Sequence, residues 1–102
     1  MSPRIAFIGS ECYPFVKTGG LGDVMYALPR ALVRMGCEVR VILPYYACLP
    51  QKYKDRMTFR GSFMMDQCQD GNAYFVGIMA TELDGVTSDF VENRDFFDGG
   101  NP

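Results

Sequence analysis

The sequence predicts an α/β fold with a hairpin-rich second half. Residues 4–44 contain a short apolar run, an amphipathic run at helical spacing and a second short apolar run, which is the pattern of a βαβ unit. Residues 57–92 contain extended segments separated by turn signals, which predict strands and a hairpin. The length of 102 residues allows one domain at most, with a single core.

The first strand is predicted at residues 4–9, Arg-Ile-Ala-Phe-Ile-Gly. Because its apolar residues are not interrupted by polar ones, we expect a strand that is buried on both faces, as in a parallel sheet. Residues 10–20 contain a proline and paired glycines, which predict a loop.

A helix is predicted to begin at Leu21. Apolar side chains at spacings of three and four are expected to line its buried face: Leu21, Val24, Met25, Leu28, Leu32 and Met35. Gly36 is a suitable helix stop. Pro29 lies inside the pattern and is expected to bend the helix or break one hydrogen bond.

The second strand is predicted at residues 38–44, parallel to the first. Residues 45–56 are ambiguous. The following segments predict an extended run, a turn at 69–72 and a second extended run that ends near residue 82. Asp84-Gly85 is a strong hairpin signal, because both central residues of a type I′ turn need positive φ, and residues 86–92 are the expected returning strand.

Composition excludes several kinds of chemistry. The chain has no histidine, so it cannot supply Ser-His-Asp or Cys-His catalysis or a histidine-ligated metal site. Residues 1–65 carry a balance of +5 and residues 66–102 a balance of −7. The basic half could favour an anionic ligand, although scattered solvated charge is the simpler alternative. Its basic residues form no dense patch, so we expect no nucleic-acid partner.

The four cysteines, Cys12, Cys37, Cys48 and Cys68, show no C-x-x-C spacing. No secretory signal precedes them, and the apolar stretch Ile5 to Ile8 is too short for a membrane span. We therefore expect reduced, mostly buried thiols in a cytoplasmic protein, with no membrane partner. Cys12 lies next to the glycine loop and is expected to be partly exposed.

The candidate site is the segment 17–23, Lys-Thr-Gly-Gly-Leu-Gly-Asp, between the first strand and the helix. A helix N-terminus attracts phosphate, glycines let a ligand approach the backbone, and Lys17 adds a full charge. The spacing is neither G-x-G-x-x-G nor a P-loop, so a tight turn with a surface lysine is an equal alternative. Asp23 could simply complement the helix dipole. Glu11 could contact sugar hydroxyls or be solvated.

Several segments resemble the amino terminus of bacterial glycogen synthases and plant starch synthases. The most specific is residues 10–24, Ser-Glu-Cys-Tyr-Pro-Phe-Val-Lys-Thr-Gly-Gly-Leu-Gly-Asp-Val. It is followed by Ala-Leu-Pro at 27–29 and Val-Arg-Val-Ile-Leu-Pro at 39–44. Asp-Gly-Val at 84–86, Phe-Val-Glu-Asn at 90–93 and Phe-Phe at 96–97 extend the resemblance through nearly the whole chain.

The resemblance implies a retaining glucosyltransferase that moves glucose from ADP-glucose to the non-reducing end of an α-1,4-glucan such as glycogen. It implies two Rossmann-like domains facing across a cleft, the GT-B fold, with no metal and no other cofactor. Lys17 would contact the sugar nucleotide, and Gly19 and Gly20 would bring N–H groups near the phosphate and the transferred sugar. Asp23 matches a motif position near the nucleotide.

Family members run to several hundred residues, so the resemblance implies that residues 1–102 are a partial amino-terminal domain. The second Rossmann-like domain is expected to lie outside these residues, no catalytic residue is assigned, and the fragment by itself is expected to be inactive. An alternative is a complete, non-catalytic α/β binding or scaffolding module. The gene sequence past Pro102 distinguishes the two, since an open frame favours a fragment. A nicotinamide-binding domain is a weak third alternative, because its glycine fingerprint is missing. Bacterial cytoplasm is the expected location, and the choice between ADP-glucose and UDP-glucose stays open.

Overall fold

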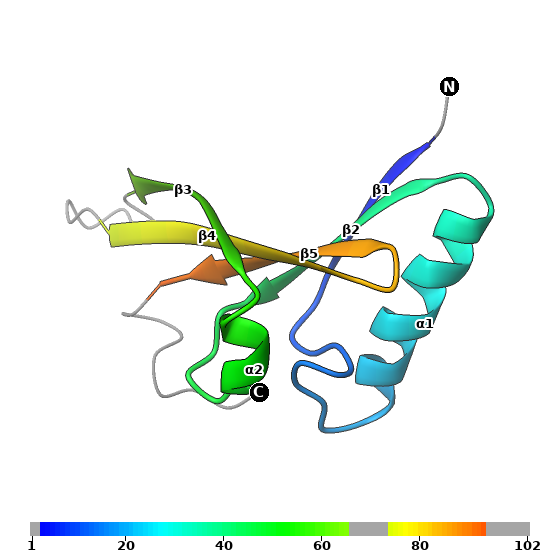
Figure 1. The fold of residues 1–102 in the computed structure, drawn as a ribbon, viewed down its shortest axis with the longest axis horizontal. Helices are drawn as coiled ribbons and strands as arrows, with labels where there is room; N and C mark the ends of the chain where they lie inside the picture. Colours follow the sequence, from blue (N-terminus) through cyan, green and yellow to red (C-terminus); the bar gives the residue numbers. More distant parts are fainter. Residues whose placement is uncertain (1–2, 66–73, 94–102) are drawn as a thin grey trace.

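The computed structural model describes residues 3–65 and 74–93, which form one mixed sheet with two helices (Figure 1). The elements in chain order are β1 (Arg4–Ile8), α1 (Gly20–Arg34), β2 (Glu38–Pro44), α2 (Gln51–Lys54), β3 (Thr58–Met65), β4 (Tyr74–Leu83) and β5 (Val86–Glu92). The strands lie in the order β1-β2-β5-β4-β3. β1, β2 and β5 are parallel, whereas β4 is antiparallel to both of its neighbours.

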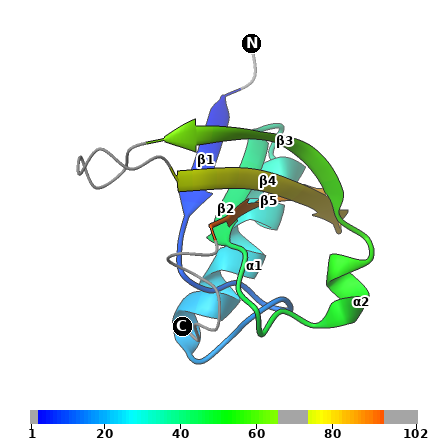
Figure 2. The same ribbon diagram turned by 90° about the vertical axis from the view of Figure 1, so that its left-hand side faces the viewer.

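The predicted βαβ unit is confirmed. β1 and β2 pair in parallel, from Arg4 opposite Glu38 to Ile8 opposite Ile42, and α1 connects them. The helix ends as predicted, since Gly36 takes a left-handed conformation with φ of 93°. α1 continues through Pro29, which is buried. α1 and α2 lie on the same side of the sheet (Figure 2).

The hairpin prediction is also confirmed. Asp84 and Gly85 have φ of 50° and 84°, and they join β4 to β5. The ambiguous segment 45–56 contains the short helix α2. The predicted turn at 69–72, Cys68 and the Phe-Phe pair at 96–97 lie outside the described residues. In the described ranges, neither helix has the length and apolar content needed to cross a membrane.

The prediction that the first strand is buried on both faces is wrong. Burial alternates along β1, and the side chain of Ile8 is 78% exposed. The reason is topological: β1 is an edge strand, and α1 covers only one face of the sheet. Within the described residues no helix covers the opposite face.

The predicted buried face of α1 is wrong for most of its members. Met25 is buried, but Leu21, Val24, Leu28 and Met35 are exposed. The helix instead buries Gly22, Met25, Pro29 and Arg30. Arg30 tolerates burial because its guanidinium stacks over the Tyr26 ring at 3.8 Å and donates to the carbonyl oxygens of Tyr26 and Leu83 at 2.7 and 2.9 Å.

The core lies between α1, α2 and the covered face of the sheet. Its buried members include Cys12, Phe15, Met25, Val41, Leu43, Val86 and Phe90. The Phe15 ring makes edge contacts with Phe90 and Tyr53, with centroid distances of 5.0 and 5.1 Å. The loop that follows β1 is therefore anchored in the core.

Candidate functional site

The loop between β1 and α1 lies beside the carboxyl ends of the parallel strands. The Gly9 N–H donates to the carbonyl of Ile42 at the end of β2, at 3.1 Å. The Tyr46 hydroxyl, just beyond β2, donates to the carbonyl oxygen of Ser10 at 3.0 Å. In open α/β sheets, ligands bind at this edge. The candidate segment 17–23 therefore occupies the position expected of a ligand site.

Backbone hydrogen bonds hold the first part of this loop in a fixed shape. The N–H of Cys12 donates to the Val16 carbonyl at 2.8 Å, and the N–H of Val16 donates back at 3.1 Å. The Tyr13 N–H donates to the Gly22 carbonyl at 3.0 Å, which connects the loop to the first turn of α1. Together with the anchored Phe15 ring, these contacts fix the chain directly before Lys17.

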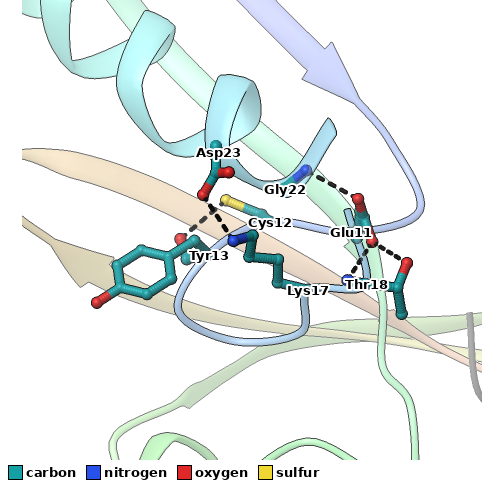
Figure 3. Close-up of polar contacts among 7 residues, drawn as sticks. All are labelled: Glu11, Cys12, Tyr13, Lys17, Thr18, Gly22 and Asp23. Carbon is teal, nitrogen blue, oxygen red and sulfur yellow. Dashed lines mark hydrogen bonds and ion pairs between the residues drawn. The ribbon is translucent and has the colours of Figure 1, made fainter. Parts of the chain in front are cut away.

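The structure brings Lys17 and Asp23 together, as Figure 3 shows. The Lys17 Nζ lies 3.2 Å from the Asp23 Oδ1, and both side chains are about half exposed. The stem of Lys17 rests on Gly22, where a Cβ would lie 2.7 Å from the Lys17 Cγ. Gly22 is therefore the glycine whose missing side chain makes room for the lysine.

The start of α1 offers amide groups without a side-chain cap. Gly19 is the N-cap residue and makes no side-chain cap hydrogen bond. In the described part of the chain, the Gly20 and Leu21 N–H groups have no acceptor. A Cβ on Gly19 or Gly20 would meet nothing within 4 Å, so no group from elsewhere in the described chain crowds these two residues on that side. Such a helix start suits an anion.

Glu11 is the site residue whose position the sequence did not predict. It is buried, and its carboxylate accepts hydrogen bonds from the Thr18 hydroxyl and N–H at 2.6 and 2.7 Å and from the Gly22 N–H at 2.9 Å (Figure 3). The Thr18 hydroxyl, followed by the Thr18 N–H, lowers the pKa of Glu11, while burial acts in the opposite direction. It is therefore a carboxylate fixed inside the loop and not a solvated acid.

The prediction that Cys12 is partly exposed is wrong, because its side chain is fully buried. Burial raises the pKa of its thiol to about 11. The thiol donates to the Tyr13 carbonyl at 3.3 Å. Cys12 is therefore an inert core group, and among the described cysteines Cys48 is the exposed one.

A cavity of about 580 Å³ lies near the amino ends of the parallel strands, away from this site. Its lining includes Arg4, Cys37, Glu38, Gly85 and Thr87, and none of the predicted site residues. Because ligands of open α/β sheets bind at the carboxyl ends, we assign no function to it.

The mixed α/β sheet, with its candidate segment at the first strand-to-helix junction, places the chain in a broad class: open α/β domains, whose ligands bind at the carboxyl ends of the strands. Residues 4–102 match the family model of the starch synthase catalytic domain, and the chain belongs to this family. The family resemblance expected from residues 10–24 is thereby confirmed.

Curated relatives and a solved structure agree with this family. The glycogen synthase of Clostridium novyi is 45% identical over 94 residues, which cover 92% of this chain and 19% of that protein. The glycogen synthase of Lactobacillus acidophilus is 40% identical, with the same coverage. The catalytic domain of starch synthase IV from Arabidopsis thaliana, bound to ADP and acarbose, has a TM-score of 0.71 and 33% identity and covers 92% of this chain. The chain spans about a fifth of the length of these proteins.

Proposed function

We propose that the chain is part of a glycogen synthase that transfers glucose from ADP-glucose to the non-reducing end of an α-1,4-glucan with retention. One observation carries the proposal: Lys17 lies beside the first turn of α1, where the Gly20 and Leu21 amides have no partner in the described part of the chain. The ADP bound to the Arabidopsis starch synthase supports an adenine nucleotide as the ligand. The glucan acceptor is inferred from the names of the relatives.

In this proposal the diphosphate of ADP-glucose replaces Asp23 as the partner of Lys17. A charge-assisted hydrogen bond from Lys17 contributes about 1.5–3 kcal/mol, and the end of α1 contributes about 0.3–1 kcal/mol. Gly20 supplies an N–H donor, and Gly19 leaves the approach open. Asp23 holds the Lys17 ammonium near this position before the ligand binds.

These groups do not complete an active site. The two carboxylates of Glu11 and Asp23 outweigh the single charge of Lys17, so the loop carries no excess of positive charge. Stabilising a departing diphosphate is an electrostatic task that needs several fixed positive groups. We therefore place those groups elsewhere in a longer protein and assign no catalytic residue here.

Exposed apolar surface supports the proposal that residues 1–102 are part of a larger amino-terminal domain of a GT-B enzyme. Leu21, Val24, Leu28 and Met35 are exposed on α1, and Ile8 is exposed on the uncovered face of the sheet. Parallel sheets are normally covered on both faces. The relatives, which are about five times longer, have the chain length needed to cover both surfaces. The chain by itself would then have no transferase activity.

Free thiols at Cys12, Cys37 and Cys48 support a reducing, cytoplasmic location.

The test uses a chimeric synthase, in which the matched 94 residues of the Clostridium novyi glycogen synthase are replaced by those of this chain. Lys17→Ala is expected to raise the KM for ADP-glucose by about tenfold or more, which corresponds to the loss of a charge-assisted hydrogen bond. Lys52→Ala, which removes an exposed lysine of α2, is the matched control and should leave this KM unchanged. An unchanged KM in the Lys17 variant would refute the site.

A further inference from the structure

We infer that Glu11 is a positioning residue for ADP-glucose, which sets the shape of the Lys17 loop from inside the molecule. The inference rests on the proposed function of Lys17. Glu11 does not face the ligand side of the loop, because its two carboxylate oxygens are occupied by groups of the loop and of α1. It acts through the residues that donate hydrogen bonds to it, Thr18 and Gly22.

The geometry connects Glu11 to both neighbours of the Lys17 side chain. One carboxylate oxygen, Oε2, accepts both donors of Thr18, the residue that follows Lys17 in the chain. The other, Oε1, accepts the N–H of Gly22, on which the Lys17 stem rests. Glu11 therefore holds both Thr18, the next residue in the chain, and Gly22, the glycine on which the Lys17 stem packs (Figure 3).

Burial makes this loop shape obligatory. Glu11 is only 4% exposed, and no basic side chain of the described residues forms an ion pair with it. A buried charge without a partner is costly, so the carboxylate depends on the three hydrogen bonds from Thr18 and Gly22. A different loop shape would leave the charge unsatisfied.

Glu11 also replaces an ordinary N-cap. Helices usually begin with a Ser, Thr, Asp or Asn whose side chain accepts an amide of the first turn. Here the N-cap is Gly19, and Glu11 accepts the third amide of α1, that of Gly22, from the preceding loop. Glu11 accepts only the Gly22 amide of this turn. The Gly20 and Leu21 amides therefore have no acceptor in the described part of the chain and are available to a ligand.

Glu11→Gln in the chimeric synthase tests the inference. The amide keeps the size of the side chain but removes its charge and turns an NH₂ donor toward the donors of Thr18 or Gly22. We expect the KM for ADP-glucose to rise by about tenfold, while the KM for glycogen stays unchanged. Hydrogen exchange measured by mass spectrometry should become faster in the peptide covering residues 12–24. Glu38→Gln, which removes an exposed carboxylate at the start of β2, is the matched control.

Thr18 provides a milder second test if Glu11→Gln lowers the yield of folded protein. Thr18→Val removes the hydroxyl donor and keeps the N–H, so it should raise the KM for ADP-glucose less than Glu11→Gln does. Thr18→Ser keeps both donors and should restore the original KM. Equal KM values in Thr18→Val and Thr18→Ser would contradict the positioning role.

Two results separate the inference from the proposed function. If Lys17→Ala leaves the KM for ADP-glucose unchanged, the proposed site itself fails. If Lys17→Ala raises this KM but Glu11→Gln lowers only the melting temperature, Glu11 is merely structural and the inference alone fails. In the Lys17→Ala background, Glu11→Gln should raise the KM clearly less than it does alone. A full effect in that background would also overturn the inference.

Discussion

Gly22→Ala tests whether the Lys17 stem needs the space above α1. A Cβ at this position would lie 2.7 Å from the Lys17 Cγ and 3.1 Å from its Cβ, so the side chain must move. Alanine favours a helix over glycine by about 1 kcal/mol, whereas crowding of this kind costs about 1–3 kcal/mol. The displaced lysine should lose about 1 kcal/mol or more of its contribution to ligand binding, which is at least a fivefold rise in the KM for ADP-glucose.

Steady-state kinetics of the chimeric synthase measure this effect. The control is Gly22→Ala in the Lys17→Ala background, where the Cγ is gone and the remaining contact, 3.1 Å from the residue 17 Cβ, needs only a small shift. There the substitution should leave the KM for ADP-glucose nearly unchanged. An unchanged KM with Lys17 present, or an equal rise in both backgrounds, would refute the packing of Lys17 on Gly22.

Three further predictions follow from the site. Asp23→Asn removes a half-exposed ion pair with Lys17 and should lower stability by less than about 1 kcal/mol in low-salt melts, a loss that disappears at high salt. Iodoacetamide at neutral pH should modify Cys48 much faster than Cys12, whose buried thiol has a pKa raised to about 11; equal rates by mass spectrometry would contradict this. Because the folded pKa of Glu11 is lowered, its stabilisation should be complete above the ordinary glutamate pKa of about 4.3 and lost as the pH falls through the lower folded value. Hydrogen exchange in residues 12–24, corrected for intrinsic rates, should then be constant between neutral pH and about pH 5, and an early increase in exchange would contradict this.

Local patterns were sufficient to predict most elements of the fold, although not α2. The existence of β1, β2 and α1 and the Asp84-Gly85 turn depend on interactions between near neighbours, and these elements are confirmed. Burial depends on what lies opposite each face. Periodicity identified an apolar side of α1, but of that side only Met25 is fully buried, and the buried residues also include Gly22, Pro29 and Arg30. Arg30 is buried through carbonyl partners, one of which lies 53 residues away in the sequence.

In the candidate site, too, proximity along the chain could be predicted, whereas contacts made by the folding of the loop could not. The predicted site residues all lie within the segment 17–23, so their proximity follows from the sequence: Lys17, Gly19, Gly20 and Asp23. The role of Glu11 could not be predicted, because a loop acid is usually solvated and its donors lie 7 and 11 residues further along the chain. Burial of Cys12 likewise depends on how the loop folds back onto the core.

A crystal structure of the chimeric synthase with ADP-glucose would test the central claim most directly. The diphosphate should accept hydrogen bonds from the Lys17 ammonium and the Gly20 amide, and Lys17 should have left Asp23. A diphosphate bound elsewhere, with Lys17 still paired to Asp23 at the surface, would contradict the account.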